Sequence, residues 1–183
     1  MGTMSRSVQV VVLCEDRQHE AFARRFLKLA VGNYRTVRFE VSPRGRGSGE
    51  QFVRNRYPRE LAYYRSRRHR VSQALWVIVD ADGADPADRI RQIESAAELA
   101  GQASRSAAER VAIFVPARNI ETWLAYLSGR SVNETEEYPR LPRERDCADH
   151  VERLDAMCRS GSLRQPAPRS LELACAEYRS RFT

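Results

Sequence analysis

Four short runs of apolar residues recur along the chain and are typical of β-strands. Residues 8–14 (VQVVVLC), 74–79 (ALWVIV) and 111–116 (VAIFVP) are almost entirely apolar, which is the pattern of strands covered on both faces. Residues 36–42 (TVRFEVS) alternate between apolar and polar side chains, which predicts a strand nearer the edge of a sheet. The pattern therefore predicts four strands.

Helical periodicity fills the segments between and after these runs. We predict helices over residues 16–30, 50–70, 87–104 and 119–127, with Pro58 breaking or kinking the second of them. Strands and helices that alternate in this way indicate an α/β fold, with a mainly parallel sheet flanked by helices.

The pattern changes in the last third of the chain. Two further helices are predicted near residues 144–160 and 168–181, so we expect a domain over residues 1–130 and a small helical C-terminal extension, residues 131–183, packed on it. The acidic, proline-interrupted segment 132–146 is either a loop over a site or an interface.

Length and composition restrict the class of protein. The 183 residues suffice for one domain, and 42% hydrophobic residues argue against a wholly disordered chain. No run of 18 apolar residues occurs, and the first residues show no apolar signal region. We therefore expect a cytoplasmic protein without a membrane partner.

The four cysteines are widely spaced and form no CxxC motif. This spacing predicts reduced thiols rather than a disulfide framework. Cys147, His150, Cys158 and Cys175 could together supply a zinc site, but Cys147 and Cys158 share a helical stripe with apolar neighbours. The stripe favours the alternative, in which the cysteines are small buried apolar side chains.

Positive charge is concentrated in one part of the sequence. The chain has a net charge of +7, and its only lysine is Lys28. Residues 35–70 hold eleven arginines against three glutamates, so this block carries +8 and the rest of the chain sums to −1. A basic surface beside an acidic site is what a nucleic-acid enzyme with a metal ion would need.

Acidic residues follow three of the predicted strands. Glu15 comes directly after the first strand, Asp80 and Asp82 after the 74–79 run, and Glu121 shortly after the fourth strand. Strand ends of a parallel sheet lie side by side, so the four carboxylates are expected to converge. Clustered carboxylates repel unless a cation lies among them, and Mg²⁺ or Mn²⁺ suits such oxygen ligands. The alternative is that these acids are only helix caps and turn formers.

Candidate phosphate ligands come from the glycine-rich segment 43–49 and the helix after it. Arg44, Arg46 and Arg54 are predicted to hold backbone phosphates, because glycines permit close approach and a helix N-terminus attracts anions. The alternative is a flexible connection. His19, one helical turn after Glu15, either binds a metal or shuttles protons, or is an exposed helix residue.

The order of these motifs resembles a Toprim domain, and more narrowly the small Toprim proteins akin to the OLD (overcoming-lysogenization-defect) nucleases. The resemblance spans roughly residues 8–128 and rests on Glu15 in VVVLCED, Asp80 and Asp82 in VIVDAD, and Asn119 with Glu121 in NIETW. It implies Mg²⁺-dependent (or Mn²⁺-dependent) hydrolysis of nucleic acid, with DNA the expected substrate. The acids would be both catalytic residues and metal ligands.

The sequence departs from the family pattern at two points. OLD-like enzymes usually carry a second acid one turn after the first glutamate, where this chain has His19 and then Glu20. They also tend to use a late lysine, which this chain lacks. The resemblance further implies a separate ATPase partner, since no GxxxxGK[ST] motif is present. The alternative function is a non-catalytic nucleic-acid-binding or regulatory subunit of an ATPase-containing, anti-phage defence complex.

Overall fold

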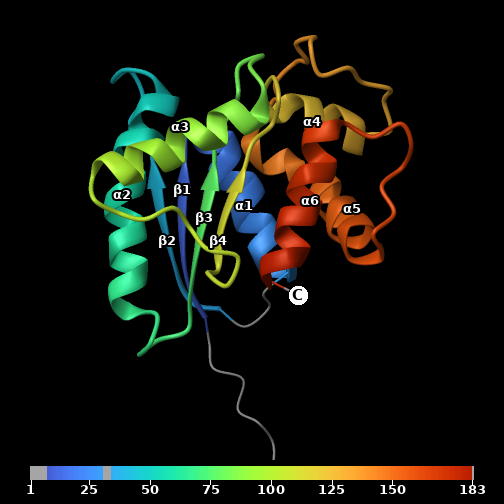
Figure 1. The fold of residues 1–183 in the computed structure, drawn as a ribbon. Coiled ribbons are helices and arrows are strands. Elements are labelled where there is room, and N and C mark those ends of the chain that lie inside the picture. Colours follow the sequence, from blue (N-terminus) through green and yellow to red (C-terminus); the bar gives the residue numbers. More distant parts are fainter. Residues whose placement is uncertain (1–7, 31–33, 183) are drawn as a thin grey trace, which may run out of the picture.

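The computed structural model describes residues 8–30 and 34–182, and it has an α/β architecture. Figure 1 labels the elements in chain order. They are β1 (Val8–Cys14), α1 (Arg17–Ala30), β2 (Tyr34–Val41), α2 (Gly49–Arg67), β3 (Gln73–Ile78), α3 (Pro86–Leu99), β4 (Val111–Phe114), α4 (Ile120–Leu127), the 3₁₀ helix η1 (Glu144–Cys147), α5 (Ala148–Ser160) and α6 (Arg169–Phe182).

The four strands form one parallel sheet in the order β2-β1-β3-β4 (Figure 1). Cys14 at the end of β1 pairs in register with Ile78 at the end of β3, so these two strands end level with each other. Acids that directly follow β1 and β3 therefore begin side by side. The prediction of an α/β fold with a parallel sheet flanked by helices is confirmed.

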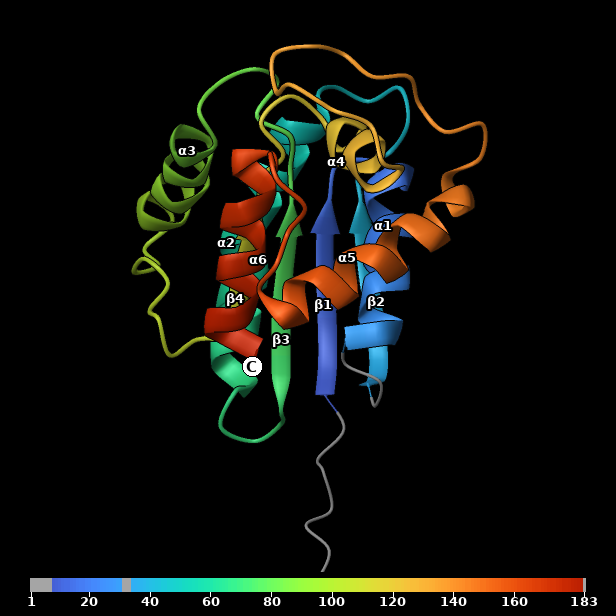
Figure 2. The same ribbon diagram turned by 90° about the vertical axis from the view of Figure 1, so that its right-hand side faces the viewer.

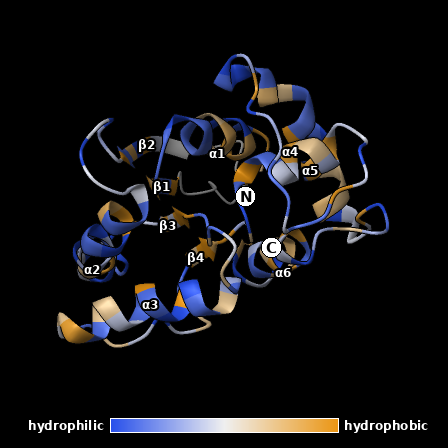
Figure 3. Ribbon diagram, turned by 90° about the horizontal axis from the view of Figure 1, so that it is seen from above, coloured by the Kyte–Doolittle hydropathy of each residue, from blue (hydrophilic) through white to orange (hydrophobic). Residues whose placement is uncertain are grey.

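Helices cover both faces of the sheet, as the view along the strands in Figure 3 shows. In β3, Trp76 and Ile78 join the buried cluster beneath α1, α4, α5 and α6, whereas Leu75 and Val77 join the cluster beneath α2 and α3. Figure 2 shows α1, α5 and α6 together on the first of these faces. Because both faces are covered, β3 is apolar at consecutive positions rather than at alternate ones.

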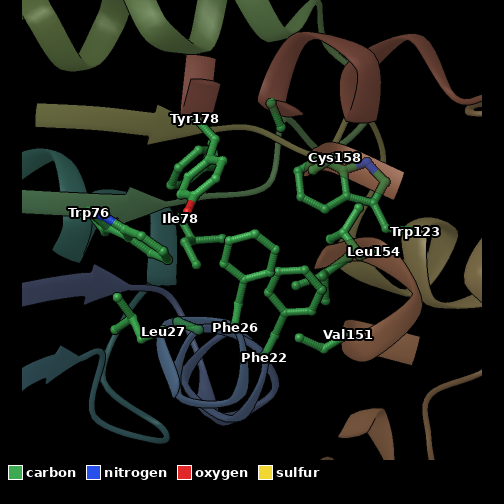
Figure 4. Close-up of a cluster of buried hydrophobic side chains, with 14 of the residues drawn as sticks. Phe22, Phe26, Leu27, Trp76, Ile78, Trp123, Val151, Leu154, Cys158 and Tyr178 are labelled. Atoms are coloured by element: carbon green, nitrogen blue, oxygen red, sulfur yellow. The ribbon is translucent and has the colours of Figure 1, made fainter. Parts of the chain in front are cut away.

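Aromatic side chains dominate the larger cluster (Figure 4). The Phe26 ring meets the Tyr178 ring edge to face at 5.2 Å, and Trp76 lies 5.8 Å from Phe26. Trp123 of α4 donates a hydrogen bond of 2.8 Å to the Ser170 hydroxyl of α6. Residues of α5 and α6 thus share the core of the sheet, and the described part of the C-terminal segment packs on the strands.

Two expectations about the helices need correction. Of the two alternatives at Pro58, the break is wrong: α2 continues through it, with Tyr57 and Leu61 on either side fully buried against the sheet. α3 ends at Leu99 rather than near residue 104, because Gly101 takes a left-handed φ of 81° that stops the helix.

The prediction of four reduced cysteines is also wrong. Cys158 of α5 and Cys175 of α6 form a disulfide, with their Cα atoms 5.4 Å apart. The sequence spacing could not show that these two helices pack together. Cys14 and Cys147 are free and buried. Because two of its four ligands are bonded to each other, the zinc alternative does not describe this structure.

Candidate metal centre at the carboxyl edge of the sheet

Glu15 and Asp80 meet where the two central strands end. Glu15 follows β1, and its Oε1 accepts a hydrogen bond of 3.1 Å from the backbone N–H of Asp80, which follows β3. The N-terminus of α2 lies against them. A Cβ added to Gly49 would lie 2.8 Å from the Cβ of Glu15, so this close approach requires glycine.

His19 reaches the same place from the first turn of α1. Its imidazole is fully buried, and its Nε2 lies 3.1 Å from Oδ1 of Asp80. On the other side of the ring, Nδ1 lies 3.3 Å from Oδ1 of Asp16, which also accepts a hydrogen bond of 2.9 Å from the His19 backbone N–H. The ring thus lies between two carboxylates, hydrogen-bonded to Asp80 through Nε2 and in contact with Asp16 at Nδ1 without a hydrogen bond, and the alternative of an exposed helix residue is wrong.

The three side chains together have the composition of a metal centre. One ligand atom each from Glu15, His19 and Asp80 lies within 4.8 Å of the other two. Two carboxylates and an imidazole suit a divalent cation, since both are common ligands of first-row ions. The residues present therefore fit a divalent metal ion.

Burial raises the pKa values of the two carboxyl groups, although His19 lies beside them. Desolvation raises the pKa of Glu15 to about 8, and the neighbouring Asp80 adds to the effect. Desolvation also raises the pKa of Asp80, although His19 opposes it. For His19, burial favours the neutral ring, but Asp80 and Asp16 outweigh it and raise its pKa to about 9. A bound cation would favour the ionised carboxylates.

Asp82 lies beside this group rather than within it. Its side chain is 68% exposed, and its Oδ2 lies 3.6 Å from Nη2 of Arg89. Asp82 and Gly83 have φ values of 53° and 87°, and the N–H of Ala84 donates to the carbonyl of Ala81, so they form the centre of a tight turn. Asp82 is thus a turn former, and its charge still raises the pKa of Glu15.

Glu121 is buried at the start of α4 on the same edge of the sheet. Its pKa is raised by desolvation and by the negative charges of Asp80 and Asp16, while Arg140, 3.5 Å from its Oε1, opposes the shift. Asn119 takes the N-cap position before it without a side-chain capping hydrogen bond. Glu20 pairs with Arg24 at 2.7 Å on the outer face of α1.

Two residues that the sequence did not single out organise this edge. Asp16 accepts the backbone N–H of His19 and lies against its ring, and the spacing of an aspartate three residues before a histidine at a helix start was the available signal. Arg89 of α3 donates from Nε to the carbonyl of Asp80 at 3.1 Å and pairs with Glu50 at 3.1 Å. Arg89 thereby braces the turn that carries Asp80.

A polar cleft of about 300 Å³ opens beside Glu15. Its walls come from the start of α1 with Arg17, from the glycine-rich loop with Arg44 and from the segment before η1 with Arg140. Part of the segment 132–146 therefore borders the site. Arg44 is 76% exposed and lies 3.4 Å from Glu144.

The other two predicted phosphate ligands differ from each other in exposure and in ion pairing. Arg46 is exposed in the loop, but Arg54 lies on α2 and pairs with Glu50 at 3.2 Å. Much of the basic block is neutralised in the same way. Glu60 binds Arg38 and Arg56, and the arginines at the far end of α2 bind Glu109; these are Arg65 and Arg68.

Comparison with known proteins does not assign this chain to a family. The chain matches no family model, no curated protein and no solved structure. Within residues 8–30 and 34–182, no helix has the length and apolar character needed to cross a membrane. Function therefore has to be argued from the site itself.

Proposed function

We propose that the chain is a metal-dependent nuclease that hydrolyses phosphodiester bonds of nucleic acid, with DNA as the first substrate to test. The observation that carries this proposal is the grouping of Glu15, His19 and Asp80 within 4.8 Å, beside a cleft with arginines at its walls. The resemblance to OLD-like Toprim proteins supports the same reaction.

Each part of the site has a separate task in this proposal. Glu15 and Asp80 would hold a divalent ion, which supplies charge stabilisation at a phosphate and an activated water. Arg44 and Arg140 would bind the phosphates on either side of the scissile bond, since both line the edge of the cleft and are largely exposed. Glu121 would hold or orient a second ion.

A plasmid-nicking assay with Mg²⁺ and with Mn²⁺ tests the proposal. We expect Asp80→Asn to lower nicking at least about 100-fold, because it removes one of the charges that would hold the ion. Asp88→Asn on α3 makes the same chemical change at an exposed residue paired with Arg91, so it should nick like the wild type. Equal nicking by the wild type and Asp80→Asn would contradict the proposal.

His19 favours a second candidate function, a non-catalytic nucleic-acid-binding or regulatory subunit of an ATPase-containing complex. It stands where OLD-like enzymes carry an acid, and its bond to Asp80 gives that carboxylate a partner without any metal. Lys28 is exposed in the last turn of α1, so it does not replace the family's late lysine. Metal-independent DNA binding that weakens steeply with salt, together with no nicking, would favour this function.

A further inference from the structure

The two nitrogens of the His19 ring face different carboxylates. Nε2 lies 3.1 Å from Oδ1 of Asp80, on the side of Glu15, and Nδ1 lies 3.3 Å from Oδ1 of Asp16. The ring is 0% exposed, so solvent does not compete for either nitrogen. A ring held in this way has a fixed direction, and its Nε2 points to the space shared with the two acids.

The spacing of the Nε2 and Oδ1 atoms suits two ligands of one ion. Adjacent ligands of an octahedral ion with bonds of about 2.1 Å are about 3 Å apart. His19 and Asp80 already have this separation, so they could bind the same cation without moving apart. Glu15 supplies a third ligand atom within the same 4.8 Å group.

Asp16 has the place of an outer partner of a metal-bound histidine. In metal centres, the ring nitrogen that is not bound to the ion commonly donates to a carboxylate, which fixes the tautomer and the orientation of the ring. Asp16 lies 3.3 Å from Nδ1 without hydrogen-bonding to it, and it accepts the backbone N–H of His19 at the start of α1, so a small rotation of the ring would bring it into that role.

We propose that His19 is a metal ligand through Nε2, that Asp16 positions it, and that the resulting nitrogen-and-oxygen ligand set selects a divalent transition ion over Mg²⁺. The inference rests on the proposed metal-dependent function and specifies its cofactor. Mg²⁺ prefers oxygen ligands, whereas imidazole binds first-row transition ions well. Mn²⁺ accepts both carboxylate and imidazole, so it is the probe of choice.

Electron paramagnetic resonance of bound Mn²⁺ tests the ligand directly. The full chain, stripped with chelator, is titrated with Mn²⁺, and pulsed spectra are recorded for coupling to a directly bound ¹⁴N. We expect ¹⁴N coupling in the wild type and its loss in His19→Asp, which restores an all-carboxylate set. His69→Asp, the same change at an exposed residue after α2, should keep the coupling.

Affinity measurements test selectivity and the role of Asp16. The wild type should bind Mn²⁺ at least about tenfold more tightly than Mg²⁺, and His19→Asp should reduce that ratio to within about threefold. Asp16→Asn preserves a helix-capping oxygen but removes the charge. It should keep the ¹⁴N coupling and weaken Mn²⁺ binding about tenfold, the usual scale for such outer partners.

The outcomes separate this inference from the proposed function. Tightly bound Mn²⁺ without ¹⁴N coupling in the wild type would overturn ligation by His19 and leave the carboxylate centre standing. Absence of Mn²⁺ binding in the wild type would overturn both. Because the wild-type spectrum decides the first question alone, a folding defect in His19→Asp would not rescue the inference.

Discussion

Two pairs of carboxylates that are shielded from solvent have different partners: Glu60 and Glu109 lie beside arginines, whereas Glu15 and Asp80 lie beside His19. Glu109 accepts hydrogen bonds from Arg65 at 2.8 and 2.9 Å, and Glu60 accepts hydrogen bonds from Arg38 and Arg56. These bonds outweigh desolvation and lower the pKa values of both acids. Glu15 and Asp80 are held at the carboxyl edge instead, and desolvation raises their pKa values.

The comparison concerns where the arginine side chains lie relative to these four carboxylates. Thirty of its residues are arginines, and yet, within the part of the chain that the structure describes, none forms a side-chain ion pair with Glu15 or Asp80. Arg89 comes near but donates to the backbone carbonyl of Asp80. The two acids thus lie beside a histidine rather than an arginine, and a cation bound there would replace the bond between Asp80 and Nε2 of His19.

Glu109→Gln should destabilise the fold strongly. The substitution leaves two arginines around a neutral amide, and breaking a buried ion pair in this way destabilises a protein by about 3 kcal/mol. Urea unfolding at pH 7 measures the loss. Glu136→Gln, in an exposed loop, is the matched control and should change the free energy of unfolding by less than about 0.5 kcal/mol. Similar urea midpoints for Glu109→Gln and Glu136→Gln would mean that the arginine-paired carboxylate adds no more stability than an exposed one.

Added Mn²⁺ should stabilise the folded state by binding at Glu15 and Asp80, and not at the arginine-paired Glu60 and Glu109. At about 100 times its dissociation constant, Mn²⁺ should raise the free energy of unfolding by about 2.7 kcal/mol, because only the folded state assembles the site. Asp80→Asn should lose this gain, and Asp88→Asn should keep it. Thermal unfolding with and without Mn²⁺ measures both; a gain that survives in Asp80→Asn would place the ion elsewhere.

The sequence was sufficient for the fold and for part of the site. Wholly apolar strands and the helical periods between them predict a doubly covered parallel sheet, and Glu15 and Asp80 meet because they directly follow neighbouring strands. Asp82 follows the same strand, but the Asp–Gly pair forms a tight turn that directs its side chain to Arg89. Local turn geometry therefore separated two acids that sequence order had grouped.

Long-range packing accounts for what the sequence could not show. Arg89 reaches the backbone of Asp80 only because α3 packs beside the turn, and the basic block loses its free charge only once Glu109, far along the chain, meets Arg65. The Cys158–Cys175 bond likewise depends on how α5 and α6 meet. No local spacing in the sequence predicts any of these pairings.

Lowering the pH should weaken the ion pairs between Glu109 and its arginines. A carboxyl whose folded pKa is lowered contributes stability that is present above its unfolded pKa of about 4.3 and is lost as the pH falls. The stability gap between the wild type and Glu109→Gln should therefore shrink between pH 7 and pH 3, by at most about 1.8 kcal/mol. Urea unfolding at several pH values measures this gap. A gap that stays constant would mean that the charge of Glu109 is irrelevant.

Glu15→Gln should have an effect of the opposite sign. The folded pKa of Glu15 is raised to about 8, so without metal the carboxyl is mostly protonated in both states at pH 4, and only the unfolded state ionises readily as the pH rises. The wild type then loses stability toward pH 8, whereas the amide, which can still accept the Asp80 N–H, does not. We expect Glu15→Gln to be close to the wild type at pH 4 and more stable by several kcal/mol at pH 8, since one pKa unit corresponds to about 1.4 kcal/mol; urea unfolding in chelator measures the gain. Glu136→Gln, in an exposed loop, should show no such gain. A loss of stability in Glu15→Gln at pH 8 would mean that this carboxylate already has a stabilising partner, and the two groups would no longer differ in kind.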